Sequence, residues 1–226
     1  ARWRNVFSSM NVYKYVDKIL KVLSLHITMD FDKKKAQYLA GLQKPDRSRA
    51  TAPDPQIMPI LEILNAYNHF YTTSSCAGRI LVVGLSPEKK KHETLWPYIT
   101  HEQADSEALM TSLPTCYHEL WFKMESPILH ICCRTLEDAQ ILLDAAKQVG
   151  LKHAGIMGTK PRIMVEVFDA VRIEALIAEN NNLVVSRRYL EYLCKHANQK
   201  LELTRDRFKK WIEKVKKGLP SGKRKD

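Results

Sequence analysis

Glycine is scarce in this sequence, and the phosphate-binding loops that depend on glycine are missing. Only 8 of the 226 residues are glycine, about half of the usual share. Neither G-x-x-x-x-G-K-S/T nor G-x-G-x-x-G occurs anywhere in the chain. A Rossmann-type nucleotide site is therefore not expected.

Paired cysteines and long apolar runs are also missing. The five cysteines, Cys76, Cys116, Cys132, Cys133 and Cys194, are odd in number and form no C-x-x-C pair. This pattern predicts a reducing compartment and no zinc site, so no bound metal is expected. No apolar run approaches the ~18 residues of a membrane span and no signal peptide is recognisable, so no membrane partner is expected. Helix-turn-helix and zinc-finger patterns are absent too, which disfavours a DNA-binding regulator.

Positive charge is abundant and lies at the two ends. The net charge of +11 is divided into +7 over residues 1–50, −5 over 51–185 and +9 over 186–226. Basic ends suit a polyanionic partner, because Lys and Arg that neutralise phosphates release counterions. Solvated helix faces and a Lys-rich tail would explain the charge equally well. An RNA or DNA partner contacted by the ends of the chain is the sharper hypothesis.

The spacing of apolar residues predicts helices at both ends of the chain and strands in its middle. This order predicts an α+β fold: one compact domain over 1–217, with a central mixed or antiparallel sheet flanked by helices, a long basic C-terminal helix and a disordered basic tail over 218–226. Helices are expected within 11–43, after Asp54 and Pro55, over 135–149 and from 186. Strands are expected at 70–73, 79–83, 118–123, 128–133, 163–168 and 183–185, with a hairpin turn at 74–78 and an irregular insert at 86–115.

The segment from Thr72 to Arg79 is the most informative part of the sequence. Successive hydroxyl side chains and small residues lead into Arg79. Exposed N–H groups of such a turn, together with hydroxyls and a guanidinium, bind carboxylates and phosphates. The ordinary alternative is a hairpin turn whose hydroxyls cap backbone groups.

This segment is one of several motifs that occur in a fixed order. The motifs are Asp46-x-Ser48, Asp54, Asn65, 73–80, Trp121–Lys123 with Pro127–His130, Ala139–Gly150 leading to Gly155-Ile156, and Tyr189-Leu190 to Arg207-Phe208. Together, from about Phe31 to Trp211, they resemble the tRNA wybutosine-synthesising protein 3 family. The resemblance implies a compact α+β fold that is not the usual Rossmann methyltransferase.

The resemblance also implies an activity. Members of this family are S-adenosylmethionine-dependent methyltransferases that methylate N4 of the tricyclic wyosine precursor at guanosine 37 of tRNA-Phe. The expected cofactor is therefore S-adenosyl-L-methionine, and the expected partner is tRNA-Phe through its anticodon loop. The expected compartment is the cytoplasm, with the mitochondrion as the alternative.

Methyl transfer to a ring nitrogen requires aligned reactants, exclusion of water and removal of the proton on N4. Asp54 and His130 are the candidates for orienting or deprotonating the base. Their ordinary alternatives are a helix N-cap and a satisfied core histidine. The candidates for binding the donor are Ser74, Ser75, Cys76, Gly78, Arg79 and Gly155, with Arg79 and Ser75 assigned to its carboxylate and Gly78 to close approach. The candidates for binding RNA are Asp46, Ser48, Trp121, Lys123, Arg205 and Lys209, with Trp121 either stacked on the base or packed in the core.

A second hypothesis belongs to a different class. It is a homologue that has lost catalysis and serves as an RNA-binding or structural subunit of a ribosomal or other ribonucleoprotein particle. The basic ends and a start without methionine favour it, as do departures from the family pattern at Ala50, Thr51, Ala154, Phe168 and Leu176. The retained residues at 54, 74–79, 121 and 130 favour the enzyme.

Overall fold

The computed structural model describes residues 30–42, 54–86, 94–115 and 117–219. The chain divides into two compact units, Ala1–Lys44 and Pro45–Asp226. In the first unit, residues 30–42 form a helix, which confirms this part of the helix expected within 11–43. Asp46, Ser48 and the tail from 220 onwards lie outside the described residues. The division into a domain over 1–217 and a tail stays a prediction.

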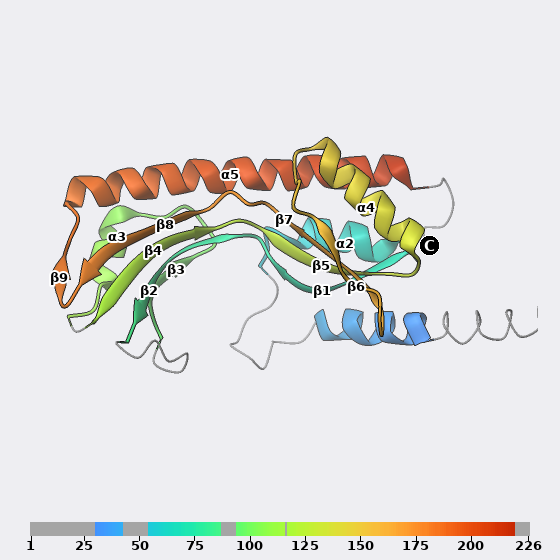
Figure 1. Ribbon diagram of the computed structural model, residues 1–226, viewed down its shortest axis with the longest axis horizontal. Helices are drawn as coiled ribbons and strands as arrows, with labels where there is room; N and C mark the ends of the chain where they lie inside the picture. Colours follow the sequence, from blue (N-terminus) through green and yellow to red (C-terminus); the bar gives the residue numbers. More distant parts are fainter. Residues whose placement is uncertain (1–29, 43–53, 87–93, 116, 220–226) are drawn as a thin grey trace, which may run out of the picture. The chain divides into compact units, whose positions relative to one another are not determined.

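The second unit combines helices and strands, as the α+β prediction requires (Figure 1). The helices are α2 (Met58–Ala66), α3 (Ser106–Ser112), α4 (Leu136–Gln148) and α5 (Arg187–Gly218). The strands are β1 (Phe70–Cys76), β2 (Arg79–Leu85), β3 (Leu95–Thr100), β4 (Glu119–Glu125), β5 (Ile128–Cys133), β6 (Gly155–Gly158), β7 (Ile163–Phe168), β8 (Ile173–Glu179) and β9 (Asn182–Leu183). No described helix has the length and apolar character needed to cross a membrane.

The strands form two sheets rather than one central sheet, and every strand pair among the described residues is antiparallel. The four-stranded sheet has the order β1-β5-β7-β6, and the five-stranded sheet has the order β3-β2-β4-β8-β9. Three paths of the chain pass directly from one sheet to the other, from β1 to β2, β4 to β5 and β7 to β8. We call the three short breaks in these paths, residues 77–78, 126–127 and 169–172, the seam.

Contacts between the breaks hold the seam together. Gly78 has φ +79°, and a Cβ atom there would lie 2.8 Å from the carbonyl oxygen of Glu125 and 2.7 Å from Cδ1 of Leu201. The hydroxyl of Ser126 donates a hydrogen bond to the carbonyl of Val171. The seam therefore requires glycine at position 78, both for its left-handed backbone and for the close packing of its neighbours.

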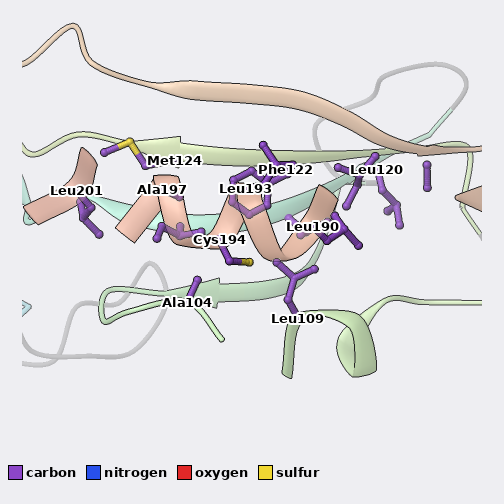
Figure 2. Close-up of a cluster of buried hydrophobic side chains, with 14 residues drawn as sticks. Ala104, Leu109, Leu120, Phe122, Met124, Leu190, Leu193, Cys194, Ala197 and Leu201 are labelled. Atoms are coloured by element: carbon purple, nitrogen blue, oxygen red, sulfur yellow. The ribbon is translucent and has the colours of Figure 1, made fainter. Parts of the chain in front are cut away.

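Helix α5 runs along one side of both sheets (Figure 1). It packs directly on β2 and β4 of the five-stranded sheet, and on α2 and α4, which lie against the four-stranded sheet. Its apolar face recurs every three or four residues, as an amphipathic helix requires. In Figure 2, Leu190, Leu193 and Ala197 of α5 lie against the side chains of β4, including Phe122 and Met124. These side chains are buried in one apolar cluster with Leu109 of α3. Burial of each large apolar side chain stabilises the fold by about 1.5–3 kcal/mol.

The structure corrects two expectations about the strands. Residues 70–83 are not a hairpin, because β1 pairs with β5 and β2 pairs with β3 and β4. Residues 74–76 therefore belong to β1, and only two residues separate it from β2. The segment 86–115 is not wholly irregular, because it contains β3 and α3. Pro97 concealed β3 in the sequence, yet an edge strand tolerates proline.

The helix signals were more reliable. Thr135 and Asp138 form the predicted capping box of α4, and Ser186 caps α5. Asp54 is not the N-cap of α2, which begins after Ile57. Its Oδ1 instead accepts a hydrogen bond from the backbone N–H of Gln56, at 3.1 Å, in the turn that precedes the helix.

Candidate functional site

A β-bulge in β1 brings two hydroxyl residues opposite one histidine. Thr72 pairs with Ile131 and Ser75 pairs with Leu129, so β1 has one residue more than β5 between these pairs. Thr73 and Ser74 both lie opposite His130 as a result. A bulge of this kind redirects side chains and is common beside active sites. Thr73 Oγ1 donates to the carbonyl oxygen of His130 at 3.2 Å and fixes the bulge to β5.

Helix α2 fixes the start of the bulge. The side-chain oxygen of Asn65 accepts a hydrogen bond from the backbone N–H of Thr72, at 2.9 Å. Its Nδ2 donates to the Thr72 hydroxyl at 2.8 Å. The motif residue Asn65 thus positions β1 immediately before the hydroxyl segment.

His130 makes a hydrogen bond with each of its ring nitrogens. Nδ1 lies 2.5 Å from Oγ of Ser74, and Nε2 lies 2.8 Å from Oε2 of Glu166 in β7. Leu129 and Ile131 are buried on the sheet face that packs against α4, so His130 lies on the opposite face. Its side chain is 23% exposed. His130 is therefore not a core histidine, and it is accessible to a substrate.

Gly155 completes this row of side chains. It pairs with Glu166, which pairs with His130, so the four strands place Ser74, His130, Glu166 and Gly155 side by side on one face. A Cβ atom at Gly155 would meet no atom within 4 Å. We call these four residues the sheet row. The sheet row has an exposed hydroxyl at one end and open space at the other.

Asp54 lies in a second cluster at the seam. Its Oδ2 is 2.9 Å from Nδ1 of His101, but Nδ1 donates its hydrogen to the carbonyl of Gly78, at 3.1 Å. The buried Oδ2 atom accepts no hydrogen bond from the described part of the chain. Burial raises the pKa of the nearby Cys76 thiol, and the negative charge of Asp54 adds to this rise. Cys76 is therefore a neutral thiol at physiological pH.

Arg205 of α5 makes hydrogen bonds to the same cluster at the seam. Its guanidinium donates hydrogen bonds to the carbonyls of Ala77 (3.0 Å), Gly78 (3.4 Å) and His101. Burial lowers the pKa of Arg205, which nevertheless stays protonated at any ordinary pH. These contacts argue that Arg205 holds the seam rather than RNA.

The remaining predicted residues lie on other parts of the surface. Arg79 forms an ion pair with Glu125 at 2.7 Å and stacks over the ring of Trp96, 5.2 Å from its centroid. Trp121 donates from its indole nitrogen to Glu119, and Lys123 forms a 2.6 Å ion pair with Glu174. Lys209 is exposed and pairs with Glu202 and Asp206. Arg205 and Lys209 line a pocket of about 250 Å³ at the seam.

The predicted site is thus only partly brought together. Ser74, His130 and Gly155 meet in the sheet row, whereas Asp54 lies at the seam near Cys76 and is linked to Gly78 only through His101. No hydrogen bond or ion pair joins Asp54 to His130 among the described residues. Cys76 is two positions from Ser74 on β1, so the two clusters lie at neighbouring points of one strand. A larger hollow of about 730 Å³ beside α3 and α5 contains none of the predicted residues.

Comparisons with known proteins show the family to which the chain belongs. The family model described as Methyltransferase TYW3 matches residues 33–217. The chain belongs to the TYW3 methyltransferase family. A tRNA wybutosine-synthesizing protein 3 homolog from Mus musculus is 34% identical over 194 residues, which cover 84% of this chain and 74% of the relative. A tRNA(Phe) 7-((3-amino-3-carboxypropyl)-4-demethylwyosine(37)-N(4))-methyltransferase 1 from Thermococcus kodakarensis is 32% identical over 192 residues, 84% of this chain and 96% of the relative.

Solved structures support the TYW3-like fold. The PH1069 protein from Pyrococcus horikoshii has a TM-score of 0.75 and 28% identity, and the match covers 84% of this chain and 97% of that protein. A hypothetical protein from Aeropyrum pernix has a TM-score of 0.64 and 24% identity, and the match covers 74% of this chain and 99% of that protein. At this identity the likeness shows the fold alone.

Sequence reasoning missed Glu166 and His101. Glu166 is the single charged residue in the otherwise apolar strand 163–168, and this isolation was the available signal. His101 follows β3 and could not be placed while its region was interpreted as an irregular insert.

Proposed function

We propose that this protein is an S-adenosylmethionine-dependent tRNA methyltransferase that methylates N4 of the tricyclic wyosine precursor at guanosine 37 of tRNA-Phe. The sheet row carries the proposal, because an accessible histidine paired with a hydroxyl and a carboxylate suits removal of the proton on N4. Membership of a methyltransferase family supports the reaction class. The Thermococcus relative is named for this reaction.

The residues fit a bound sulfonium donor in two respects. The open space over Gly155 and the exposed Ser74 leave room on the face of His130. At the seam, Oδ2 of Asp54 lies 2.9 Å from Nδ1 of His101 but accepts no hydrogen bond from the described residues, and it is an acceptor suited to an ammonium group. When bound, the donor supplies an electrophilic methyl group. Ser74, Ser75, Cys76 and Gly155 are the residues proposed to hold it, whereas Arg79 would bind a carboxylate only by leaving Glu125.

The RNA is proposed to bind across the outer face of the five-stranded sheet. Trp121 and Lys123 alternate on β4 with buried residues and therefore share this face. Trp96 of the edge strand β3 is exposed and adds a second aromatic ring. An unstacked base gains about 1–3 kcal/mol by stacking on such a ring. The cytoplasm is the proposed compartment, supported by the free thiols of the four described cysteines.

Incubation of the protein with hypomodified tRNA-Phe and S-adenosylmethionine tests the proposal directly. We expect mass spectrometry of the released nucleosides to show one added methyl group on the wyosine precursor, and calorimetry to show donor binding. An unmodified nucleoside and a silent titration would contradict the enzyme. Retained RNA binding together with copurification in a ribonucleoprotein particle would then favour the catalytically inactive homologue.

Substitutions separate catalysis from binding. We expect His130→Ala and Asp54→Ala to lower kcat at least 100-fold, while the affinity for tRNA stays within threefold of wild type. The single-turnover rate and a filter-binding assay measure the two quantities. Turnover close to wild type in both variants would refute these roles. A loss confined to His130→Ala would assign the reaction to the sheet row alone.

A further inference from the structure

Strand β7 carries one charged side chain, and the strand register aims it at His130. Val165 and Val167 are buried on the side of α4, so Glu166 lies on the opposite face. Its Oε2 lies 2.8 Å from Nε2 of His130. The bulge of β1 aims Ser74 at the other ring nitrogen. The three groups therefore form a continuous chain, Ser74–His130–Glu166.

The chemistry of the three groups fixes where the protons lie. A carboxylate can only accept a hydrogen bond, so Nε2 of His130 carries a hydrogen and donates it to Glu166. The neutral imidazole then has a lone pair on Nδ1, which accepts the hydroxyl hydrogen of Ser74. The exposed end of the chain is thus the Ser74 oxygen, whose proton is directed toward a base.

We propose that Glu166 is a positioning residue that acts through His130 and makes the Ser74 hydroxyl the acceptor of the proton lost by the methylated nitrogen. This inference rests on the proposed function. The N4–H bond breaks as Oγ of Ser74 takes its proton, and the Ser74 proton passes to Nδ1 of His130. The nitrogen electron pair forms the bond to the methyl carbon, and the electrons of the broken S–C bond stay on sulfur. The imidazolium is stabilised by Glu166 until it releases its proton to water.

Glu166 is the charged residue that contacts His130, because the neighbouring positions on this face hold other kinds of side chain. On β6, the neighbour of Glu166 is Gly155, which has no side chain. The next position along the same face holds Tyr71 and Cys132, with Arg162 close to Tyr71. In the other direction lie Phe168 and, against its ring, His153. Among the described residues, Glu166 is the only charged group hydrogen-bonded to the imidazole.

A spectroscopic measurement tests the inference without donor or tRNA. A carboxylate that accepts a hydrogen bond from Nε2 fixes the neutral imidazole as its Nε2–H tautomer. We therefore expect ¹⁵N NMR of the neutral His130 ring to show the Nε2–H tautomer in wild type and a larger share of the Nδ1–H tautomer in Glu166→Gln. Glu166→Asp keeps the charge and is expected to retain most of the wild-type tautomer. Glu213→Gln, an exposed change on α5, serves as the control.

Kinetics test the consequence for catalysis. We expect Glu166→Gln to lower kcat about 10–100-fold at an unchanged KM for tRNA, and Glu166→Asp to recover part of the loss. Ser74→Ala should lose at least ~100-fold in kcat.

The possible failures can be told apart. An unchanged His130 tautomer and an unchanged kcat in Glu166→Gln would overturn the role of Glu166. Activity of Ser74→Ala within threefold of wild type would overturn the relay through the hydroxyl. An inactive wild-type protein would instead refute the proposed function, while the NMR measurement of the tautomer would still test the link between Glu166 and His130. Circular dichroism of each variant checks that it is folded.

Discussion

Gly78 lies where the chain leaves the four-stranded sheet for the five-stranded sheet. We expect Gly78→Ala to lower the free energy of unfolding by about 2–4 kcal/mol, from the left-handed backbone and the crowding together. Leu201 is flexible enough to move aside, but the carbonyl of Glu125, 2.8 Å from the added methyl, belongs to a paired strand. Urea denaturation measures the change.

Gly155→Ala is the matched control for this substitution. Its backbone is not left-handed, and the added methyl would meet no atom within 4 Å. We expect the free energy of unfolding to stay within ~0.5 kcal/mol of wild type. If the two variants lost the same free energy of unfolding, backbone strain and crowding at the seam would not be the reason for the loss in Gly78→Ala.

The candidate site was predictable at the level of single residues but not of their grouping. Ser74, His130 and Gly155 were named from the sequence, and the strand register brings them into one row. A bulge sets that register. No residue pattern in the sequence predicts that β1 has one residue more than β5 at this point. The same uncertainty concealed Glu166, whose partner is fixed only when β5 and β7 pair.

At the scale of elements, α5 contacts two of the three breaks of the seam. Arg205 bonds to the first break, residues 77–78, and Arg207 forms an ion pair with the third, residues 169–172. Nη1 of Arg207 lies 2.7 Å from Oδ2 of Asp169, whose side chain is 5% exposed. Arg207→Ala would leave a buried carboxylate without its cation. We expect a loss of about 3 kcal/mol in the free energy of unfolding, measured by urea denaturation with an unchanged m-value.

Two comparisons make this expectation specific. Lys209→Ala removes an exposed ion pair from the same helix and should cost less than ~1 kcal/mol. Asp169→Asn, added to Arg207→Ala, removes the buried charge and should recover part of the loss. If Arg207→Ala costs no more than Lys209→Ala, the ion pair does not hold the seam.

Elements with strong local signals were predicted well, and elements that depend on tertiary pairing were not. The capping box of α4 and the long stripe of α5 are local patterns that the structure confirms. Strand β8, with the sequence IEALIAE, contains helix-favouring residues and becomes a strand by pairing with β4. The division into two sheets could not be predicted either, because it depends on which strands pair on each side of breaks of only two to four residues.

On the scale of the whole molecule, a truncation of the basic C-terminal helix would not test its proposed contribution to RNA binding. Helix α5 carries eleven Lys or Arg and four Glu or Asp, but Phe208, Trp211, Ile212 and Val215 of the same helix are buried. Deleting residues 205–226 would therefore remove core side chains and unfold the protein, whatever the helix contributes to RNA binding. Only substitutions on the exposed face can test the charge.

Lys210, Lys214 and Lys217 provide that test, because they are exposed and recur at spacings of four and three on one helix face. If this stripe neutralises tRNA phosphates, changing all three to Gln should reduce the salt slope of log K by about 2, since each phosphate contact contributes roughly 0.7–0.9. Filter binding at several salt concentrations measures the slope. Changing Lys147, Lys152 and Lys160 to Gln removes the same charge from the acidic central region and should leave the slope closer to wild type. Equal flattening in both variants would mean that net charge, rather than the stripe on α5, attracts the RNA, and the basic face of the helix would then be only a solvated surface.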